Sequence, residues 1–424
     1  MKFLGILIGI VCTSFFYFPF PLFFFPSVNT KMVLAAMGLL LLLVQLGVNG
    51  HRSINKDFFI VSLFALGVSF ASWLTMVLND SMDDAYLSYL VSMWVWTGAA
   101  YFVVSSIKAV HGKISVELVC FYMIAVGAMQ CLLAILLDMY APLKAFINWI
   151  LAGDYPDNGR LYGLGCAYDV AGGRFAVLLV MIAFLLPKAF SKENPYRYVV
   201  PLLAAFGIIV MIGNMIGRTT TVGLILALSY WGYILLTGKG VTGRERTLMI
   251  RWIVVLGLVF AVTFTVLYHT NAFWHKHIRF GFEGFFSLVE KGTWEVHSNE
   301  MLKEGFIFPD NLRTWIIGDG YMGAMERDPY YMGPLWYGFY KGTDAGYSRF
   351  LFYFGLIGLL TFMTFMAKVC QICAKHFPSY GYMFIMILLL NYMIWVKVST
   401  DIFLAFAPFL CLASQSKLTE CKRL

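Results

Sequence analysis

Apolar runs of about 17–25 residues recur along the whole chain and constrain its fold more than any other feature. A helix needs this length to cross the hydrocarbon core of a bilayer, where only helices and closed barrels satisfy their backbone groups. The 424 residues are 60% hydrophobic and only 13% charged, far from the balance of a soluble globular domain. We therefore predict an all-α, polytopic membrane helical bundle of about twelve transmembrane helices. The expected spans are 3–20, 31–49, 57–78, 87–107, 115–138, 173–187, 199–216, 220–236, 252–270, 347–366, 381–396 and 398–414.

Lysine and arginine residues concentrate in alternate connectors, which predicts the orientation of the spans. These basic segments should be cytoplasmic, and both termini with them. The first apolar run follows Met1 and Lys2 with no small-x-small cleavage site, so we expect an uncleaved span rather than a secretory signal. The net charge of +8 is mostly this bias and does not indicate nucleic acid binding. The basic segments are HRSINKD, KAVHGK, KAFSKENPYRY, TGKGVTGRERTLMIR and the tail KLTECKRL.

Two long connectors, 139–172 and 271–346, fall on the opposite, extracytoplasmic side. Connectors beyond about 12–15 residues are usually functional, so we predict one membrane domain over 1–424, with residues 271–346 forming a mainly helical cap over a site. Within this connector, FGFEGFFSLVEKG predicts a short amphipathic helix, since its apolar residues recur at three-and-four spacing. That helix could lie at the bilayer surface or pack on top of the bundle.

Charged side chains at the ends of the apolar runs are the candidate functional groups, because a charge within a span costs roughly 2.5–3.5 kcal/mol on insertion scales. Arg218 lies in IGRTTTVG, a turn between two runs. Arg160 and Arg174 lie in the glycine-rich segment GRLYGLGCAYDVAGGRF, whose guanidinium and backbone N–H donors suit a phosphate. Lys397 and Asp401 flank the last tight turn, where an ordinary ion pair is an equal alternative. Any one of these arginines could instead snorkel to lipid headgroups.

Several classes of chemistry lack their motifs. The sequence contains no H-E-x-x-H, D-x-D pair, P-loop or G-x-S-x-G, so zinc, nucleotide and serine-hydrolase chemistry are unsupported. Cys370 and Cys373 form a C-x-x-C without a second pair. The histidines in and just before the long connector, at 269, 275, 277 and 297, fit no standard metal spacing.

Four segments carry a resemblance to a known family. They are GRLYGLGCAYDVAGGRF, IGRTTTVG, EGFFSLVEKGTWEVHSNEMLKEGFIFPDNLRTWIIGDGY and TDAGYSRFLFYFGLIG. In this order they resemble bacterial O-antigen polymerases of the Wzy type, within the O-antigen ligase and polymerase superfamily of C-type glycosyltransferases. The resemblance covers most of the chain. It implies an inner-membrane enzyme with its active site facing the periplasm, which moves a glycan from undecaprenyl diphosphate to the nonreducing end of another lipid-linked repeat unit.

The same resemblance implies roles for individual residues. Related ligases carry a histidine, proposed as base, ahead of a Gly-x-x-Gly span, and aligning GLIG with that pattern places Asp344 at the histidine's position. Asp344 is thus the candidate general base, in a partly desolvated setting, although it could be only the N-cap of the following span. Arg349 would orient it or contact the diphosphate, and Tyr347 would bind sugar or pack. Asp344 and Arg349 are five residues apart and point to different faces of a helix, so we do not expect a simple i,i+4 salt bridge between them. For the diphosphate we expect Arg218 first, then Arg160 and Arg349, with Arg174 and Lys397 outside them and without a metal ion or other cofactor.

Two other functions remain open. The nearest is an O-antigen ligase, which transfers the glycan to lipid A core; the aspartate in place of histidine favours the polymerase. A transporter of lipid-linked sugars is less favoured, because transporters carry polar groups inside many spans. The polymerase would use lipid-linked donor and acceptor, membrane lipids and a protein that regulates chain length as partners.

Overall fold

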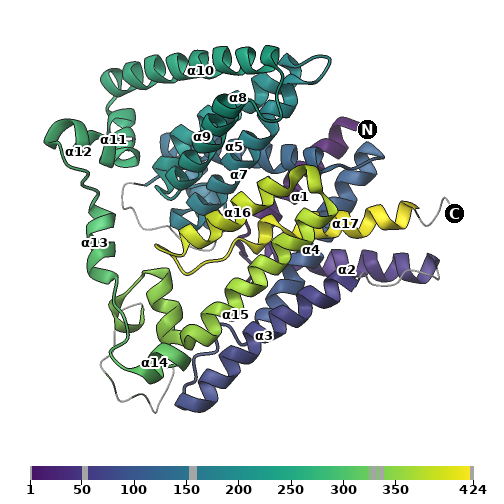
Figure 1. Cartoon of the computed structure of the whole chain (residues 1–424), viewed down its shortest axis with the longest axis vertical. Coiled ribbons are helices and arrows are strands. Elements are labelled where there is room, and N and C mark those ends of the chain that lie inside the picture. Colours follow the sequence, from purple (N-terminus) through teal and green to yellow (C-terminus); the bar gives the residue numbers. More distant parts are fainter. Residues whose placement is uncertain are drawn as a thin grey trace. The chain divides into compact units, whose positions relative to one another are not determined.

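Helices make up nearly all of the secondary structure (Figure 1). The computed structural model describes residues 2–49, 56–151, 160–323, 325, 331, 333 and 339–420. Within these described residues, eight helices are long and apolar enough to cross a membrane, and four further apolar helices are shorter. The predicted all-α class is confirmed, whereas the count of about twelve spans stays a prediction. Parts of two predicted cytoplasmic segments, residues 51–55 and 421–424, lie outside the described residues.

The chain divides into two compact units. Unit 1 comprises Met1–Leu34 and Val103–Glu295, and unit 2 comprises Ala35–Phe102 and Val296–Leu424. The connector 271–346 is thus shared between them, and the single membrane domain and the cap stay predictions. Two helices, α2 (Thr30–Asn49) and α4 (Tyr89–His111), continue from one unit into the other.

Helix α7 is the centre of unit 1 and is buried almost throughout. Helix α9 packs closely against α7 because Gly223 has no side chain. A Cβ on Gly223 would lie 2.3 Å from the Cα of Ala176 on α7. Small residues let apolar helices approach in this way. The Trp231 indole N–H donates to the Ala183 carbonyl at 2.9 Å and fixes the pair. The elements of unit 1 are α1 (Lys2–Tyr17), β1 (Pro21–Leu22), β2 (Phe25–Asn29), α5 (Val116–Met139), α6 (Ala141–Ile150), α7 (Tyr168–Phe190), α8 (Tyr196–Ile216), α9 (Thr220–Thr237), α10 (Gly243–Thr270), α11 (Ala272–Gly281) and α12 (Glu283–Lys291).

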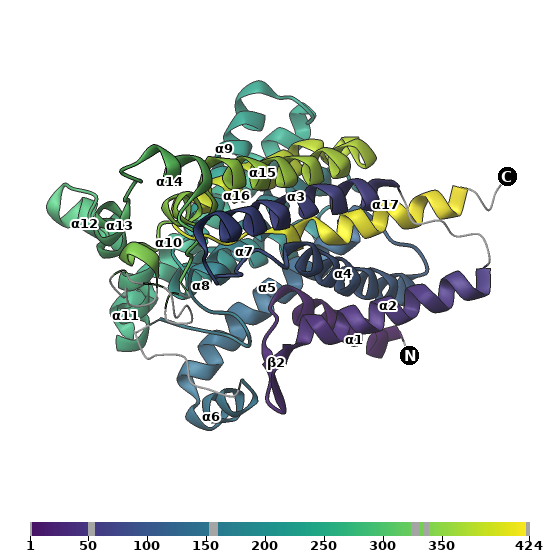
Figure 2. The same cartoon turned by 90° about the horizontal axis from the view of Figure 1, so that it is seen from below.

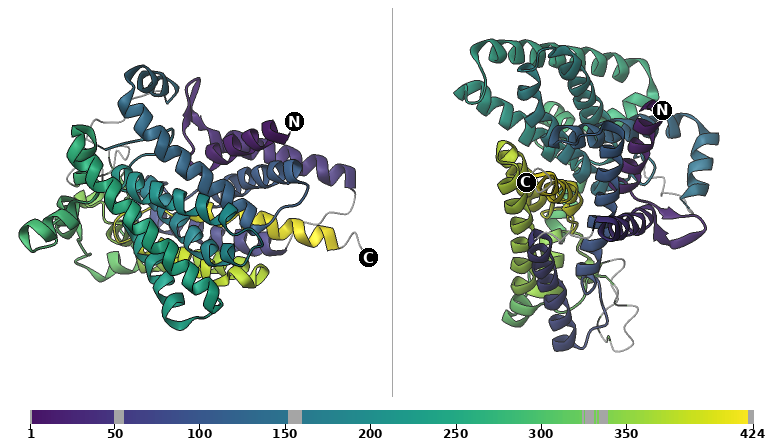
Figure 3. Two further views of the ribbon diagram at one scale, coloured as in Figure 1. Left: turned by 90° about the horizontal axis from the view of Figure 1, so that it is seen from above. Right: turned by 90° about the vertical axis from the view of Figure 1, so that its right-hand side faces the viewer.

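Helix α10 lies on the outside of unit 1 (Figures 1 and 3). It begins with a capping box, in which Thr242 and Glu245 satisfy each other's backbone N–H groups. Of its 28 residues only Met249 is buried. An apolar helix with so little of its surface covered is typical of one that faces lipid.

The β hairpin and α6 are neighbours in unit 1 (Figure 2). The Phe23 ring lies 4.6 Å from that of Trp149. Beneath them a small core joins the hairpin end, α5, α6 and the chain before α7, through Phe20, Leu137, Ile147, Leu151 and Tyr162.

In unit 2, helices α3 and α15 pack side by side (Figure 2). Ser72 Oγ and the Tyr353 hydroxyl lie 2.7 Å apart near one end of the pair, and His376 Nε2 lies 2.7 Å from Asp57 Oδ2 at the other. The elements of unit 2 are α3 (Lys56–Asn79), α13 (His297–Gly305), α14 (Leu312–Ile317), η2 (Tyr340–Gly342), α15 (Gly346–His376), η3 (Pro378–Tyr380), α16 (Gly381–Ile394), η4 (Phe403–Ala405) and α17 (Ala407–Glu420).

Helix α15 is interrupted at Phe354 and Gly355. Gly355 has φ 60°, and a Cβ there would lie 2.4 Å from the Ile316 carbonyl at the end of α14. The carbonyls of Phe352 and Tyr353 accept hydrogen bonds from the Asp319 and Gly320 amides at 2.6 and 3.0 Å. The break therefore attaches the loop after α14 to α15, and the backbone groups that it frees are satisfied.

Several predicted span boundaries differ from the observed helices. Helix α7 begins at Tyr168 rather than 173, so Asp169 and Arg174 are helical. Helix α10 begins nine residues before 252, at Gly243, and α15 continues ten residues past 366, to His376. The final α-helix, α17, begins at Ala407 after an irregular stretch that was predicted to be span.

Candidate functional site

In unit 1, the segment before α7, the turn between α8 and α9, and the end of α11 converge. The Leu161 amide donates to the Met215 carbonyl at 3.3 Å. A Cβ on Gly217 would lie 2.3 Å from the Tyr168 carbonyl oxygen, and one on Gly281 would lie 3.2 Å from the Met215 nitrogen. Only glycine allows such backbone approaches. Because of them, Arg160 and Arg218, which are 58 positions apart in sequence, are neighbours in the structure.

Arg218 is held in the turn between α8 and α9. It forms an ion pair through Nη1 with Oε2 of Glu283, and its guanidinium lies over the Phe280 ring, 4.3 Å from the centroid. Burial lowers the pKa of Arg218, as does Arg160, whereas Glu283 and Asp169 raise it. An arginine nevertheless keeps its charge. The turn therefore presents a partly desolvated cation.

Arg160 stands over the same aromatic ring. Its guanidinium carbon lies 5.4 Å from the centroid of Phe280 and 5.6 Å from that of Tyr168. Asp169 lies 3.9 Å away and also accepts a 2.7 Å hydrogen bond from the Thr219 hydroxyl, so one carboxylate links both arginine-bearing segments. We call Arg160, Arg218 and Phe280 the arginine pair site. Two planar guanidinium groups on one ring offer two sets of N–H donors, an arrangement that suits a polyanion.

Arg174 lies in a different environment from the arginine pair site. Its guanidinium lies 5.7 Å from the Phe18 ring, and its carbonyl accepts from the Tyr17 hydroxyl at 3.0 Å. It is also a charged neighbour of Cys166. Burial raises the pKa of the Cys166 thiol, against a lowering effect of Arg174. The structure thus places Arg174 against α1, and its predicted role as an outer phosphate ligand stays a prediction.

In unit 2, Asp344 precedes the first turn of α15. The helix begins at Gly346 with Ala345 at its N-cap position and no capping side chain, so the N-cap alternative for Asp344 is wrong. Asp344 is exposed, contrary to the expected partial desolvation. Next to it, the Thr343 hydroxyl donates to the Gly305 carbonyl and accepts from the Ala345 amide, which fixes the approach of the chain to α15.

Tyr347 and Lys397 belong to segments that pack together. The Tyr347 amide donates to the Trp395 carbonyl at 2.9 Å, and its hydroxyl donates to the Tyr392 carbonyl at 3.0 Å. Gly346 allows this contact, since a Cβ would lie 2.4 Å from the same Trp395 oxygen. Lys397 is half-buried in the turn that follows. The Tyr347 hydroxyl is therefore used in packing, which was the alternative to sugar binding.

Arg349 stacks on Phe339 and has a structural partner. Its guanidinium lies 4.0 Å from the Phe339 centroid and donates to the Met322 carbonyl at 3.4 Å. Asp344 and Asp83 are charged neighbours, yet among the described residues no ion pair within 4.0 Å joins Arg349 to Asp344. The expectation that these two do not form a simple ion pair is confirmed.

The sequence did not point to Asp83 and Tyr86. Asp83 is buried and accepts from the Met322 and Gly323 amides at 2.7 and 3.0 Å, so it holds the same loop that Arg349 touches. Desolvation raises the pKa of Tyr86, and Asp401 raises it further, so the phenol stays neutral. Its hydroxyl donates to the Ser399 carbonyl at 3.3 Å. The sequence places Asp83 in a short turn, and nothing in that turn indicates its contact with Met322, which is 239 positions away.

Glu283 and Phe280 were also not singled out. Both lie in or next to the predicted amphipathic helix, which is confirmed as α12, but their partners are distant in sequence. His277 of the neighbouring helix α11 is buried and lies 3.4 Å from Asp138. In the described part of the chain, no three His, Cys, Asp or Glu side chains are grouped to hold a metal ion. The predicted metal independence is untested by this.

The two groups of candidate residues are thus defined separately. Unit 1 brings Arg160 and Arg218 together and leaves Arg174 against α1. Unit 2 brings Asp344, Tyr347, Arg349 and the turn of Lys397 to the start of α15. No protein-family model, curated protein or solved structure matches the chain.

Proposed function

We propose that the chain is an O-antigen polymerase, a multi-span glycosyltransferase that uses a lipid-diphosphate sugar. It moves a glycan from undecaprenyl diphosphate onto the nonreducing end of another lipid-linked repeat unit. The observation that carries the proposal is the arginine pair site, in which Arg160 and Arg218 share the ring of Phe280 at the ends of span-length helices. Charged side chains at membrane depth usually pair, line a cavity or mark a substrate path.

A diphosphate leaving group fits these donors. Glycosyl transfer breaks the bond between C1 of the donor sugar and the phosphate oxygen, and negative charge grows on the diphosphate as it departs. Guanidinium groups fixed before the reaction stabilise that charge without reorganisation. Because each guanidinium can bind two oxygens, two of them can hold both phosphoryl groups, and we propose that no metal ion is required.

For the acceptor we propose Asp344 as general base. Its exposed carboxylate is accessible to a sugar hydroxyl. The acceptor oxygen attacks C1 from the face opposite the diphosphate, its proton passes to Asp344, and the products are the lengthened glycan and free undecaprenyl diphosphate. The configuration at C1 is therefore inverted, and positioned proton transfer of this kind contributes roughly 10²–10⁴-fold.

The proposal places the protein in the bacterial inner membrane with several spans. The basic connectors and both termini face the cytoplasm and the arginine pair site faces the periplasm. Its partners are the lipid-linked donor and acceptor, surrounding lipids and a chain-length regulator.

The product that accumulates in a deletion strain tests the proposal. A strain without the polymerase should attach single repeat units to lipid A core. Core without any repeat units would instead identify a ligase, and lipid-linked units retained on the cytoplasmic side would identify a transporter.

Reconstitution tests the site. Purified protein with a lipid-linked repeat unit should form polymer, and Arg218→Ala should lower the rate by roughly 10²-fold, the usual cost of losing one charge-stabilising donor. Arg313→Ala is the matched control, since this exposed arginine makes one hydrogen bond to the Leu78 carbonyl. Equal losses in both variants would contradict the assignment of the arginine pair site.

A further inference from the structure

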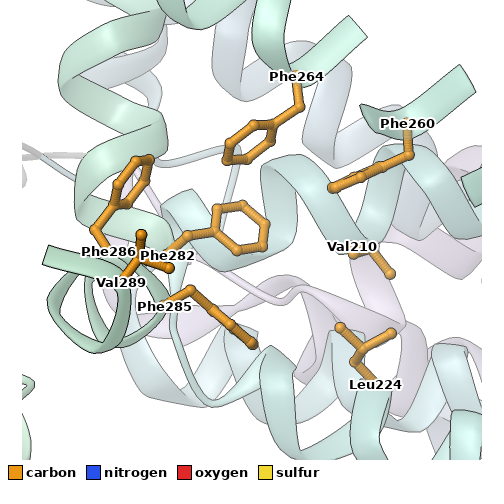
Figure 4. A pocket seen from close by; sticks show the side chains of 8 residues that line it. All are labelled: Val210, Leu224, Phe260, Phe264, Phe282, Phe285, Phe286 and Val289. Carbon is orange, nitrogen blue, oxygen red and sulfur yellow. The ribbon is translucent and has the colours of Figure 1, made fainter. Parts of the chain in front are cut away.

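Unit 1 contains an apolar pocket of about 410 Å³. This volume lies in the range of roughly 300–1,000 Å³ that ligand sites occupy. Rings from α10 enter it from one side and side chains of α12, α8 and α9 from the others (Figure 4). Its lining is entirely apolar: Val210, Leu224, Phe260, Phe264, Phe282, Phe285, Phe286 and Val289.

Two residues that line the pocket lie on α8 and α9, the helices on either side of Arg218. Val210 is six residues before the end of α8, and Leu224 is four residues after the start of α9. At 1.5 Å per residue these side chains are about 9 and 6 Å from the helix ends that the turn of Arg218 connects. A molecule with its charge at the turn and an apolar chain running along α8 and α9 would reach both.

Helix α12 connects the two regions. Glu283 at its first position binds Arg218, while Phe282 and Phe286, on either side of it in sequence, line the pocket. A carboxylate on arginine occupies the kind of position that a phosphate oxygen takes. The outer wall is α10, which leaves its apolar residues uncovered, for example Val259 and Val262 at 57% and 63% exposure. An exposed apolar surface of this kind suits contact with lipid.

We propose that this pocket binds the isoprenoid segment next to the diphosphate of a polyprenyl diphosphate, whose phosphate replaces Glu283 on Arg218. The inference rests on the proposed function and identifies the binding site of the donor lipid. A single phosphodiester headgroup would engage one guanidinium, whereas Arg160 and Arg218 on one ring match two linked phosphoryl groups. In the absence of lipid, Glu283 keeps the site closed.

Binding to the purified full-length protein tests the pocket. Undecaprenyl diphosphate is titrated and followed by native mass spectrometry, with phosphatidylglycerol and inorganic pyrophosphate as separate probes. Val289→Trp should fill the mouth of the pocket and weaken lipid binding about tenfold, the effect of excluding two or three buried carbons. Val289 is 86% exposed, so the larger side chain leaves the helix intact. Leu288→Trp, on the same helix but outside the pocket, should bind as the wild type does.

The headgroup contact has its own variant. Glu283→Gln should tighten undecaprenyl diphosphate binding several-fold, because the phosphate no longer displaces a charged competitor. Glu295→Gln is the control, since Glu295 pairs with Lys291 at 2.5 Å outside the pocket. Pyrophosphate should bind more tightly to Glu283→Gln, yet equally to Val289→Trp and the wild type, because it has no chain.

Three results would overturn the proposal: wild-type affinity in Val289→Trp, equal affinity for phosphatidylglycerol, or weaker binding in Glu283→Gln. These readouts do not depend on transfer. If Val289→Trp forms normal polymer and binds lipid normally, the proposed lipid pocket is wrong, whereas the proposed function is unaffected. If the wild type and the variants bind lipid as expected but the wild type forms no polymer, the proposed function is wrong, whereas the proposed lipid pocket is supported.

Discussion

Glu283 binds Arg218 and thereby ties the first turn of α12 to the turn between α8 and α9. The two residues are 65 positions apart, and Phe280 contributes a ring face to the same guanidinium. An ion pair with this burial is costly unless geometry and further contacts compensate it. The ring of Phe280 supplies one such contact.

Phe280→Leu should weaken transfer about tenfold, because both guanidinium groups lose the ring that positions them and each such contact contributes about 0.5–2 kcal/mol. The measurement is kcat/KM with the lipid-linked repeat unit. Phe308→Leu is the control, since the Phe308 ring stacks on Trp315 in unit 2. An unchanged rate in Phe280→Leu would show that the shared ring has no role in positioning.

Asp344→Asn should abolish most polymer formation, with a loss of roughly 10²–10⁴-fold, because the amide cannot accept the acceptor proton. Binding of the lipid donor should be unaffected. Asp344→Glu should retain part of the rate, since it keeps a carboxylate at a shifted position. Asp310→Asn changes another exposed aspartate of unit 2 and should have full activity; full activity in Asp344→Asn as well would remove the proposed base.

Gly355→Ala should destabilise the protein by about 2–4 kcal/mol, because the residue has φ 60° and its Cβ would lie 2.4 Å from the Ile316 carbonyl. Thermal unfolding in detergent should show a lower midpoint. Gly257→Ala is the matched control: it lies within α10, and a Cβ there has no neighbour within 4 Å. That variant should be as stable as the wild type or slightly more so.

Asp83→Asn should loosen the loop after α14, since charged acceptors contribute about 1.5–3 kcal/mol per hydrogen bond and Asp83 accepts from two amides. Hydrogen exchange of the Met322 and Gly323 amides should accelerate. Asp84→Asn, a neighbouring exposed carboxylate, should leave their exchange unchanged. If the Met322 and Gly323 amides exchange at the same rate in both variants, other contacts, such as that of Arg349 with the Met322 carbonyl, hold the loop in place.

Treatment of the purified protein with EDTA should leave the rate of polymer formation within about twofold, because the guanidinium groups supply the charge that a divalent cation would otherwise provide. A loss that added Mg²⁺ restores would contradict the metal-independent mechanism.

The length and position of most helices follow from the apolar runs alone. The expected spans for α5, α8 and α9 agree with the observed helices within three residues, because their apolar runs end at strong signals such as the N-cap Ser115 and the left-handed Gly238. The start of α7 was missed because Asp169 and two glycines at a helix end look like a loop. Helix α6 was missed because its ten residues are too short for a span.

The site residues were only partly predictable. Arg160, Arg218, Asp344 and Arg349 stand out because charges are few in an apolar chain. The partners Glu283, Phe280 and Asp83 are 62 or more positions away from the groups that they contact, and no local pattern encodes such a contact. The break at Gly355 was not predicted, because its cause is the backbone of α14.

The uncovered surface of α10 gives the bilayer itself a part in substrate affinity. The apolar part of α10, residues 252–270, is about 28 Å long, close to the roughly 30 Å of a hydrocarbon layer, so the tilt of the helix should depend on the thickness of that layer. Phe260 and Phe264 move with that tilt, while Val210 and Leu224 stay with α8 and α9. Thicker or thinner membranes should therefore widen or narrow the space available to the lipid chain, and the composition of the host membrane becomes one determinant of how firmly the carrier is held.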